Sequence, residues 1–326
     1  MNRLYPLKFI PQIKDKIWGG KKLREILGKS EASDKAGESW EISGVQGNIS
    51  IAENGFLAGN NLQELIEVYM GDLVGDKIYD QFGIEFPLLI KFIDATRQLS
   101  IQVHPNDEMA LKRHGSYGKT EMWYILQADK NSELIVGFNK KIEKSTYKHH
   151  LENKSLPEIL NYVNIYAGDV IFLPAGRIHA IGSGILLAEI QQTSDVTYRI
   201  YDFDRLDSNG NPRELHTDLA LDAIDYNFDS KHKIDYSSKV NEPSELVTCK
   251  YFSTNFLDFN KPVDKDYLKI DSFVIYMCLD GDFNIEYYEN ETVKVSKGDS
   301  LIIPAELKNV RLNPVTETKI LEVYIG

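Results

Sequence analysis

Short runs of β-branched and aromatic residues follow one another at nearly regular intervals from residue 245 to the end of the chain. The runs at residues 273–278, 283–288 and 319–324 have the length of strands, and Gly, Pro, Asn and Asp separate them. A series of this kind, almost without helical periodicity, is typical of an antiparallel sandwich or jelly roll. The sequence therefore predicts a mainly β fold.

The residues before this region show the same strand-like runs with helices added between them. Residues 106–115 are predicted to form a short helix, because Asn106 and Asp107 are favourable at its start and Gly115 at its end. The polar, lysine-rich stretch 229–244 is the best candidate for a linker. Further helices are expected at residues 62–70, 155–163 and 214–224, and strands at residues 88–93, 99–103, 122–126, 134–138, 170–173 and 186–191.

Composition excludes several classes of protein. Lys and Arg number 37 against 49 Asp and Glu, so the net charge of −12 argues against a general nucleic-acid binder. The longest apolar stretches, at residues 86–90 and 170–175, fall far short of a membrane span, and the N-terminus lacks the pattern of a signal peptide. We therefore expect a cytoplasmic protein without membrane or nucleic-acid partners, whose Cys249 and Cys278 are reduced.

Two polar residues share one face of a predicted strand. Gln102 and His104 alternate with the apolar Ile101 and Val103, which is the period of a β-strand. By itself this pattern equally describes a strand with one face in solvent. Glu121, directly ahead of an apolar strand, would by itself be interpreted as a surface carboxylate.

A third segment changes this interpretation. Gly168, Pro174, Gly176 and His179 have the spacing G-x5-P-x-G-x2-H, which resembles the second cupin motif, whose histidine is a metal ligand. The family's Asn four residues later is Ser183 in this sequence. Two imidazoles, one carboxylate and one amide suit a four-ligand divalent metal site with room for water or substrate. The predicted ligands are Gln102, His104, Glu121 and His179.

Longer motifs carry a more specific resemblance. QVHPND at 102–107, GKTEMWYIL at 118–126, the segment ending at His179, and the run at 189–205 together resemble type I mannose-6-phosphate isomerases of the shorter bacterial branch. That resemblance implies one Zn²⁺ per chain on the four predicted ligands. It also implies that Arg199, Lys119 and Glu189 are active-site residues, that Ser100 and Arg205 contact the substrate phosphate, and that Lys91 lines the same substrate-binding pocket.

A second segment repeats the motif without its histidine. From Gly298 the spacing G-x5-P recurs, with Glu306 in place of the second glycine and Asn309 in place of the histidine. We expect two cupin-like jelly-roll domains: a catalytic domain with helical insertions at residues 1–240, and a degenerate C-terminal jelly roll at residues 241–326. The second domain is expected to hold no catalytic metal.

The implied reaction interconverts mannose 6-phosphate and fructose 6-phosphate by proton transfer through an enediol, so the protein must stabilise an oxyanion and supply a base. Glu189 follows an apolar strand, where burial would raise a carboxylate pKa, and this makes it one candidate base. A hydroxide on the metal is the other candidate, and Glu189 could instead only orient Arg199 or a ligand histidine.

Two other functions remain open: an iron cupin oxygenase, and a non-catalytic metal-binding cupin that senses sugar phosphates. We expect a sugar-phosphate substrate and a monomer or weak homodimer.

Overall fold

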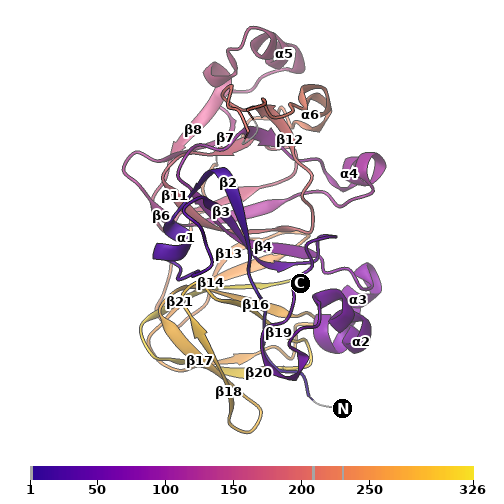
Figure 1. Ribbon diagram of the computed structural model, residues 1–326, viewed down its shortest axis with the longest axis vertical. Coiled ribbons are helices and arrows are strands. Elements are labelled where there is room, and N and C mark those ends of the chain that lie inside the picture. Colours follow the sequence, from indigo (N-terminus) through magenta and orange to yellow (C-terminus); the bar gives the residue numbers. More distant parts are fainter. Residues whose placement is uncertain (1–2, 208–209, 230) are drawn as a thin grey trace.

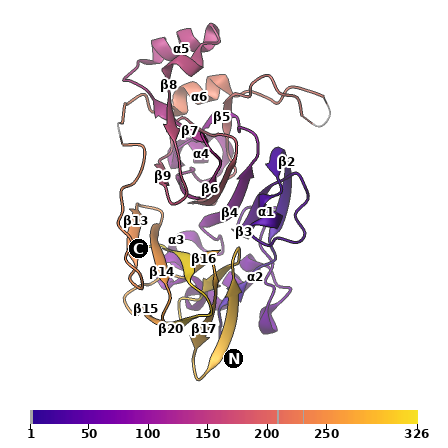
Figure 2. The same ribbon diagram turned by 90° about the vertical axis from the view of Figure 1, so that its left-hand side faces the viewer.

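Antiparallel sheets build both halves of the molecule, which are stacked along its long axis (Figures 1 and 2). The computed structural model describes residues 3–207, 210–229 and 231–326. Over these residues the predicted mainly β fold is confirmed, and each half is a jelly roll made of two sheets. We call them the first and the second barrel.

The first barrel combines a six-stranded sheet with a five-stranded one. The six-stranded sheet has the order β2-β3-β4-β11-β6-β9, and the five-stranded sheet has the order β12-β5-β10-β7-β8. The strands of the first sheet are β2 Gln12–Gly20, β3 Ala36–Ser43, β4 Leu88–Ala95, β11 Ile185–Gln192, β6 Glu121–Ala128 and β9 Val170–Leu173. Those of the second are β12 Tyr198–Tyr201, β5 Ile101–Val103, β10 His179–Ile181, β7 Glu133–Phe138 and β8 Leu160–Asn164.

The second barrel combines the strand orders β1-β19-β16-β21-β14-β13 and β15-β20-β17-β18. Its first strand comes from the N-terminus, because β1 pairs with β19. The predicted domain boundary at residue 240 stays a prediction. The strands are β1 Leu7–Lys8, β13 Ser244–Thr248, β14 Ser253–Phe259, β15 Val263–Asp266, β16 Val274–Asp280, β17 Asp282–Tyr287, β18 Glu291–Ser296, β19 Ser300–Ile303, β20 Asn309–Pro314 and β21 Thr318–Tyr324.

The inner strands β4 and β11 of the six-stranded sheet, and the first part of β6, are buried on both faces, and this explains their largely apolar sequences. Along β4, Ile90 and Phe92 belong to the core shared with the second barrel, whereas Ile93 belongs to the core inside the first barrel. Side chains alternate between the two faces of a strand. The polar residues of β4, β6 and β11 that share the face of Ile93 are therefore directed into the first barrel.

Helices cover the sheets and connect their strands. In α2 a capping box joins Asn61 and Glu64, and α4 begins after its N-cap Asn106 and ends at the left-handed Gly115, as predicted. Although they come early in the sequence, α2 and α3 lie beside the second barrel (Figure 1), where Phe273 N donates to Val74 O. The helices are α1 Lys22–Glu25, α2 Leu62–Val74, α3 Asp76–Phe82, α4 Asp107–His114, α5 Lys144–Glu152 and α6 Thr217–Ala223, with 3-10 turns η1 Gly55–Leu57 and η2 Leu156–Ile159.

One helix prediction was wrong. Residues 155–163 form the turn η2 and then β8, because residues 160–164 pair with β7 instead of continuing a helix. The helix in this region is α5, and no helix was predicted there. Within the described residues, none of the helices is both long enough and apolar enough to cross a bilayer.

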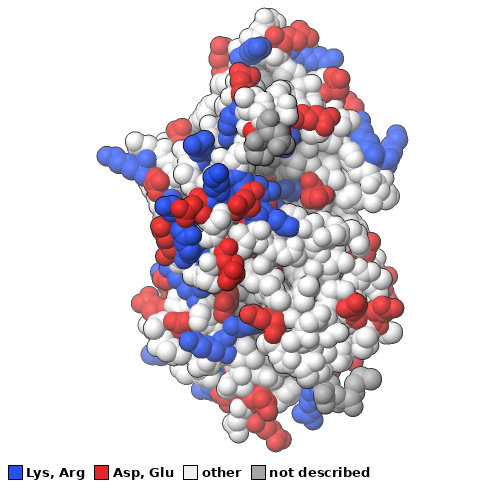
Figure 3. All heavy atoms as spheres, in the orientation of Figure 1, with Lys and Arg blue, Asp and Glu red and all other residues white. Residues whose placement is uncertain are grey.

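The negative net charge is not spread evenly over the surface. Figure 3 shows Lys and Arg side chains gathered around the middle of the visible face, over β2 and α1, with acidic side chains among them. The strand β2 contributes Lys14 and Lys16, and α1 contributes Lys22 and Arg24.

Candidate active site

Two neighbouring strands and the start of a third bring the predicted metal ligands together. Gln102 on β5 lies directly opposite His179, the first residue of β10. His104 follows β5 by one residue, and Glu121 begins β6 in the facing sheet. Segments far apart in the sequence therefore meet inside one end of the first barrel.

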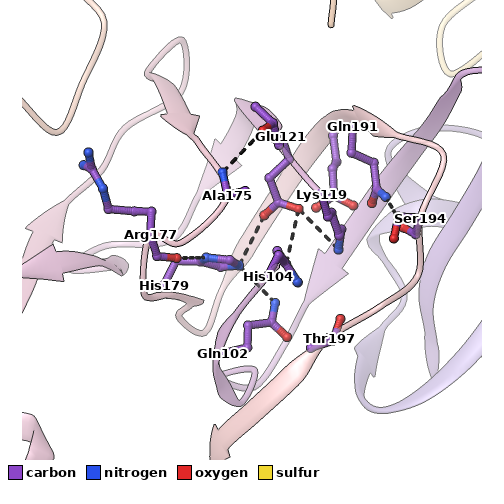
Figure 4. A network of polar contacts seen from close by, with 12 residues as sticks. Gln102, His104, Lys119, Glu121, Ala175, Arg177, His179, Gln191, Ser194 and Thr197 are labelled. Atoms are coloured by element: carbon purple, nitrogen blue, oxygen red, sulfur yellow. Dashed lines mark hydrogen bonds and ion pairs between the residues drawn. The ribbon is translucent and has the colours of Figure 1, made fainter. Parts of the chain in front are cut away.

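The side chains converge as predicted (Figure 4). Glu121 Oε1 lies 3.2 Å from His179 Nε2, and Glu121 Oε2 lies 3.5 Å from His104 Nε2. One ligand atom from each of these residues lies within 4.8 Å of the other two. All three side chains are buried. Among the described residues they are the one group of this kind that could hold a metal ion.

Backbone carbonyls orient both imidazoles. His104 Nδ1 donates to Val196 O at 3.0 Å, and His179 Nδ1 donates to Arg177 O at 2.9 Å. A ring nitrogen that donates leaves the other with its lone pair free. Both Nε2 atoms therefore present lone pairs toward Glu121, which is the arrangement that partners outside the ligand set impose on metal-binding histidines.

The chemistry of these atoms fits a cation. His104 Nε2 and both carboxylate oxygens of Glu121 are buried, and none of them has a hydrogen-bond partner within the described part of the chain. Burial lowers the pKa of His104 well below its usual value and that of His179 to about 4, so both rings are neutral. Burial also raises the pKa of Glu121, although Lys119 opposes this shift. A divalent ion between these atoms would satisfy all of them.

Gln102 lies at the edge of this group, with its amide nitrogen directed toward His179. Its Nε2 lies 3.2 Å from His179 Nε2 and donates to it. The sequence interpretation requires the amide oxygen as the ligand. A half-turn of the amide would exchange the two atoms, so the position of Gln102 allows this ligand role.

Glu189 lies in a charged network inside the barrel. It pairs with Lys91 on the neighbouring strand at 3.0 Å and accepts a hydrogen bond from Trp123 Nε1 at 2.9 Å. Burial alone would raise its pKa, but the charges of Lys91 and Lys119 outweigh burial and lower the pKa. The expected rise was therefore wrong, because the apolar sequence around Glu189 did not reveal two buried ammonium groups.

Lys91 is fully engaged in the same network. Its Nζ contacts Glu189 Oε1 and donates to Gln191 Oε1 at 2.9 Å, and it lies 5.0 Å from the centre of the Trp40 ring. Although burial opposes it, the charge of Glu189 raises the pKa of Lys91. The predicted place of Lys91 in the substrate-binding pocket stays a prediction, and its contacts with Glu189 and Gln191 would compete with a direct contact to substrate.

The other predicted residues surround the ligand group. Lys119 is buried, with its Nζ 3.3 Å from Glu121 Oε2. Arg199 on β12 lies opposite Gln102, so that both side chains leave the same face. Ser100 is buried directly before β5, and Arg205 donates to the carbonyl of Gln98, two residues before Ser100.

Sequence reasoning missed two members of the network. Gln191 is directed into the barrel two residues after Glu189, and Trp123 two residues after Glu121. The two-residue period of a strand, applied outward from the predicted site residues, would have indicated both.

A cavity of about 650 Å³ lies elsewhere, between the two barrels. Its walls include Asp107 and residues 192–195 from the first barrel, and Lys250 and Tyr251 from the second. None of the predicted site residues lines it. This cavity is therefore separate from the buried group of predicted site residues.

Comparisons with known proteins agree with the sequence motifs. Residues 6–150 match the family model for the catalytic domain of type I phosphomannose isomerase, and residues 243–324 match the cupin domain of mannose-6-phosphate isomerase. The mannose-6-phosphate isomerase ManA of Bacillus subtilis is 35% identical over 319 residues, which cover 96% of this chain and 97% of that protein. The chain belongs to the type I mannose-6-phosphate isomerase family.

Further relatives support this assignment. The mannose-6-phosphate isomerase of Streptococcus mutans is 33% identical over 305 residues, covering 93% of this chain and 94% of that protein. The crystal structure of a mannose 6-phosphate isomerase from Bacillus subtilis is similar with a TM-score of 0.89 at 33% identity, covering 98% of this chain and 99% of that one. The family resemblance inferred from the sequence motifs is thus confirmed.

Proposed function

We propose that this protein interconverts mannose 6-phosphate and fructose 6-phosphate, with one zinc ion per chain held by Gln102, His104, Glu121 and His179. The observation that carries the proposal is the convergence of buried, unpartnered ligand atoms of His104, Glu121 and His179 in a chain of this family. Two imidazoles, a carboxylate and an amide are ligands that zinc accepts.

When bound, the ion would act as a Lewis acid for the oxygens of the open-chain sugar. The chain's own residues supply the rest of the electrostatic stabilisation. Lys119 adds a buried positive charge beside Glu121, and Arg199 adds another across from Gln102. Fixed cations next to a developing oxyanion lower the barrier, because they need not reorganise during the reaction.

Glu189 is assigned a positioning role in this proposal. A carboxylate whose pKa lies far below neutrality is a weak base, and the ideal catalytic pKa lies near the working pH. Its two contacts, with Lys91 and Trp123, instead hold the interior around the ligands. The rings of Trp123 and His179 pack edge to face, with their centroids 5.4 Å apart, so Glu189 acts on His179 through the indole.

The test is a coupled assay of mannose 6-phosphate conversion before chelation, after chelation, and after zinc is restored. We expect activity to disappear with the metal and to return with zinc. His149 is exposed on α5 and serves as the matched control, because His149→Asn leaves the metal content unchanged whereas His104→Asn removes it. Activity that is indifferent to chelation would contradict the proposal, and oxygen consumption with bound iron would favour an oxygenase instead.

We also propose that the protein acts in the cytoplasm as a monomer or weak homodimer. Sedimentation over a range of protein concentrations tests the second point. A tight dimer that persists at nanomolar concentration would contradict it.

A further inference from the structure

Three arginines gather where β12 ends. Arg199 lies within β12, and Arg205 and Arg213 both form ion pairs with the carboxylate of Asp202. Arg213 Nε donates to Asp202 Oδ2 at 2.7 Å, and Arg205 Nε donates to the Asp202 carbonyl at 3.1 Å. Arg213 was not among the predicted site residues.

The backbone brings the last two arginines together. Phe203 and Asp204 both have positive φ, 57° and 54°, and Arg205 N donates to Asp202 O at 3.2 Å. This tight turn folds Arg205 back onto Asp202. Leu206 and Pro212 then form an isolated bridge, so that Arg205 and Arg213 leave the loop from adjacent positions. Positive φ at two consecutive non-glycine residues is unfavourable and persists where the surroundings enforce it.

The cluster carries more positive charge than Asp202 balances. The guanidinium groups of Arg199, Arg205 and Arg213 and the carboxylate of Asp202 sum to +2. Glu214 is also near, but 83% of its side chain is exposed and solvent screens it. Burial, followed by the charge of Arg213, lowers the pKa of Arg199, which shows that the arginines repel one another.

Two donors in this cluster lack acceptors among the described residues, whereas all three nitrogens of Arg205 donate to Asp202 or Gln98. Arg199 Nε is buried without a hydrogen-bond partner in the described part of the chain. Arg213 uses Nε and Nη2 on Asp202, and among the described residues nothing accepts from its Nη1. A partly buried cluster with net positive charge and unused donors is the arrangement that binds a multiply charged anion.

The cluster adjoins the candidate active site. Arg199 shares a strand face with Gln102, and Arg205 is tied to Gln98, close in sequence to the buried Ser100. An anion bound by Arg205 and Arg213 would therefore lie near the junction of β12 and β5, the strands that carry Arg199 and Gln102.

We propose that Arg213, together with Arg205, binds the phosphoryl group of the sugar-phosphate substrate, and that Asp202 is a positioning residue that aligns the two guanidinium groups. This inference rests on the proposed function. A phosphate monoester carries a charge of about −1.5 to −2 near neutral pH, which matches the cluster. Planar guanidinium groups bind such oxygens through paired hydrogen bonds.

The experiment compares Arg213→Gln and Arg213→Lys with the wild type. For Arg213→Gln we expect the KM for mannose 6-phosphate and the inhibition constant of inorganic phosphate to rise about 10- to 100-fold, since one charge-assisted hydrogen-bonding group is lost. The kcat/KM for unphosphorylated mannose should stay within about twofold. Arg213→Lys should be intermediate, because it keeps the charge and loses the paired geometry.

Arg113→Gln is the matched control, since Arg113 pairs with Asp222 at the surface and lies outside the cluster. Arg113→Gln should leave unchanged the KM for mannose 6-phosphate, the inhibition constant of inorganic phosphate and the kcat/KM for mannose. Equal losses with mannose and mannose 6-phosphate, or an unchanged inhibition constant for phosphate, would overturn the inference, because both outcomes indicate a purely structural Arg213.

Calorimetric titration of inorganic phosphate separates this inference from the proposed function. If the wild type lacks isomerase activity yet binds phosphate, and Arg213→Gln weakens that binding at least about tenfold, the anion site stands while the isomerase proposal fails. If the wild type isomerises the sugar and phosphate binds both proteins equally, the isomerase proposal stands and the role of Arg213 is refuted.

Discussion

Most strands of each barrel have a counterpart in the other, although β12 has none in the second barrel, and the two barrels differ at the positions of the proposed metal ligands. Gly168 and Pro174 in the first barrel have counterparts in Gly298 and Pro304 of the second. At the same spacing from the glycine, His179 begins β10 and Asn309 begins β20. The second barrel therefore keeps the turn and strand geometry of the motif and has lost its imidazole.

Strand register extends the correspondence into the interior. Glu121 pairs with Leu173, and Val274 pairs with Ile303, so an apolar residue replaces the carboxylate ligand. By the same strand registers, Tyr276 of the second barrel occupies the position of Trp123 in the first. Trp123 pairs with Glu189 on the neighbouring strand, and Tyr276 pairs in the same way with Glu322.

One feature is common to both interiors: a buried carboxylate that is held by a lysine. Glu189 contacts Lys91 at 3.0 Å, and Glu322 contacts Lys265 at 2.7 Å. Glu322 also accepts from Asn255 at 3.0 Å. Because the second barrel has this carboxylate without the proposed histidine and carboxylate ligands, a buried carboxylate at this position does not by itself require a metal site. The group His104, Glu121 and His179, which could hold a metal ion, is what distinguishes the first barrel.

The largest effect is expected when His179 of the first barrel is replaced by asparagine, the residue at the corresponding position of the second barrel. His179→Asn should lower isomerase activity on the order of 10³-fold, since it removes a ligand and with it the electrostatic stabilisation of the oxyanion. Metal content should fall from about one ion per chain to near zero. Elemental analysis and the coupled assay measure these effects, and circular dichroism should show an intact fold. Full metal occupancy in this variant would contradict the ligand assignment.

The two buried carboxylates should have similar effects on stability but different effects on activity. Glu189→Gln and Glu322→Gln should each lower the free energy of unfolding by about 3–5 kcal/mol, because the buried Lys91 and the largely buried Lys265 each lose a partner. Activity should fall about 10- to 100-fold for Glu189→Gln only, through the loosened Trp123 and His179. Denaturant unfolding and kcat at a fixed metal concentration are the measurements.

Two further observations sharpen this comparison. The acid limb of the pH–rate profile should persist in Glu189→Gln, and its disappearance would identify Glu189 as the base. If Glu322→Gln lowered kcat as much as Glu189→Gln, the two barrels would not be functionally distinct.

A smaller effect should appear in the pH dependence of stability. The pKa of Glu189 is lowered in the folded protein, so its stabilising contribution is present above the pKa of the unfolded chain and is lost as the pH falls toward the folded pKa of about 2. From pH 4 down to pH 2.5, unfolding free energy should therefore fall less steeply in Glu189→Gln than in the wild type. The difference between the two slopes approaches about 1.4 kcal/mol per pH unit, which corresponds to the uptake of one proton on unfolding. The unfolding free energies are measured by urea titration at each pH. If they fell equally steeply with pH in both proteins, the pKa of Glu189 would not be lowered by folding.

The sequence predicted the parts of the site that strand periodicity and motif spacing control. The four proposed ligands lie on or beside strands whose register follows from apolar alternation, and the fold brings them together. The charged network was harder to predict, because Lys91 and Glu189 are far apart in sequence and an apolar strand does not reveal what faces it. Arg213 was missed because its partner Asp202 is reached only through a tight turn.

The smallest effect is expected from the reverse exchange in the second barrel. Asn309→His restores the motif histidine at an exposed position, and the free energy of unfolding should change by no more than about 0.5 kcal/mol. Metal content should not rise, because Val274 occupies the place of the carboxylate ligand and an imidazole alone does not complete a zinc site. Elemental analysis measures the metal content of this variant and of the wild type. A second equivalent of bound metal would show that the second barrel has lost only its histidine, and the contrast between the barrels would then reduce to one side chain.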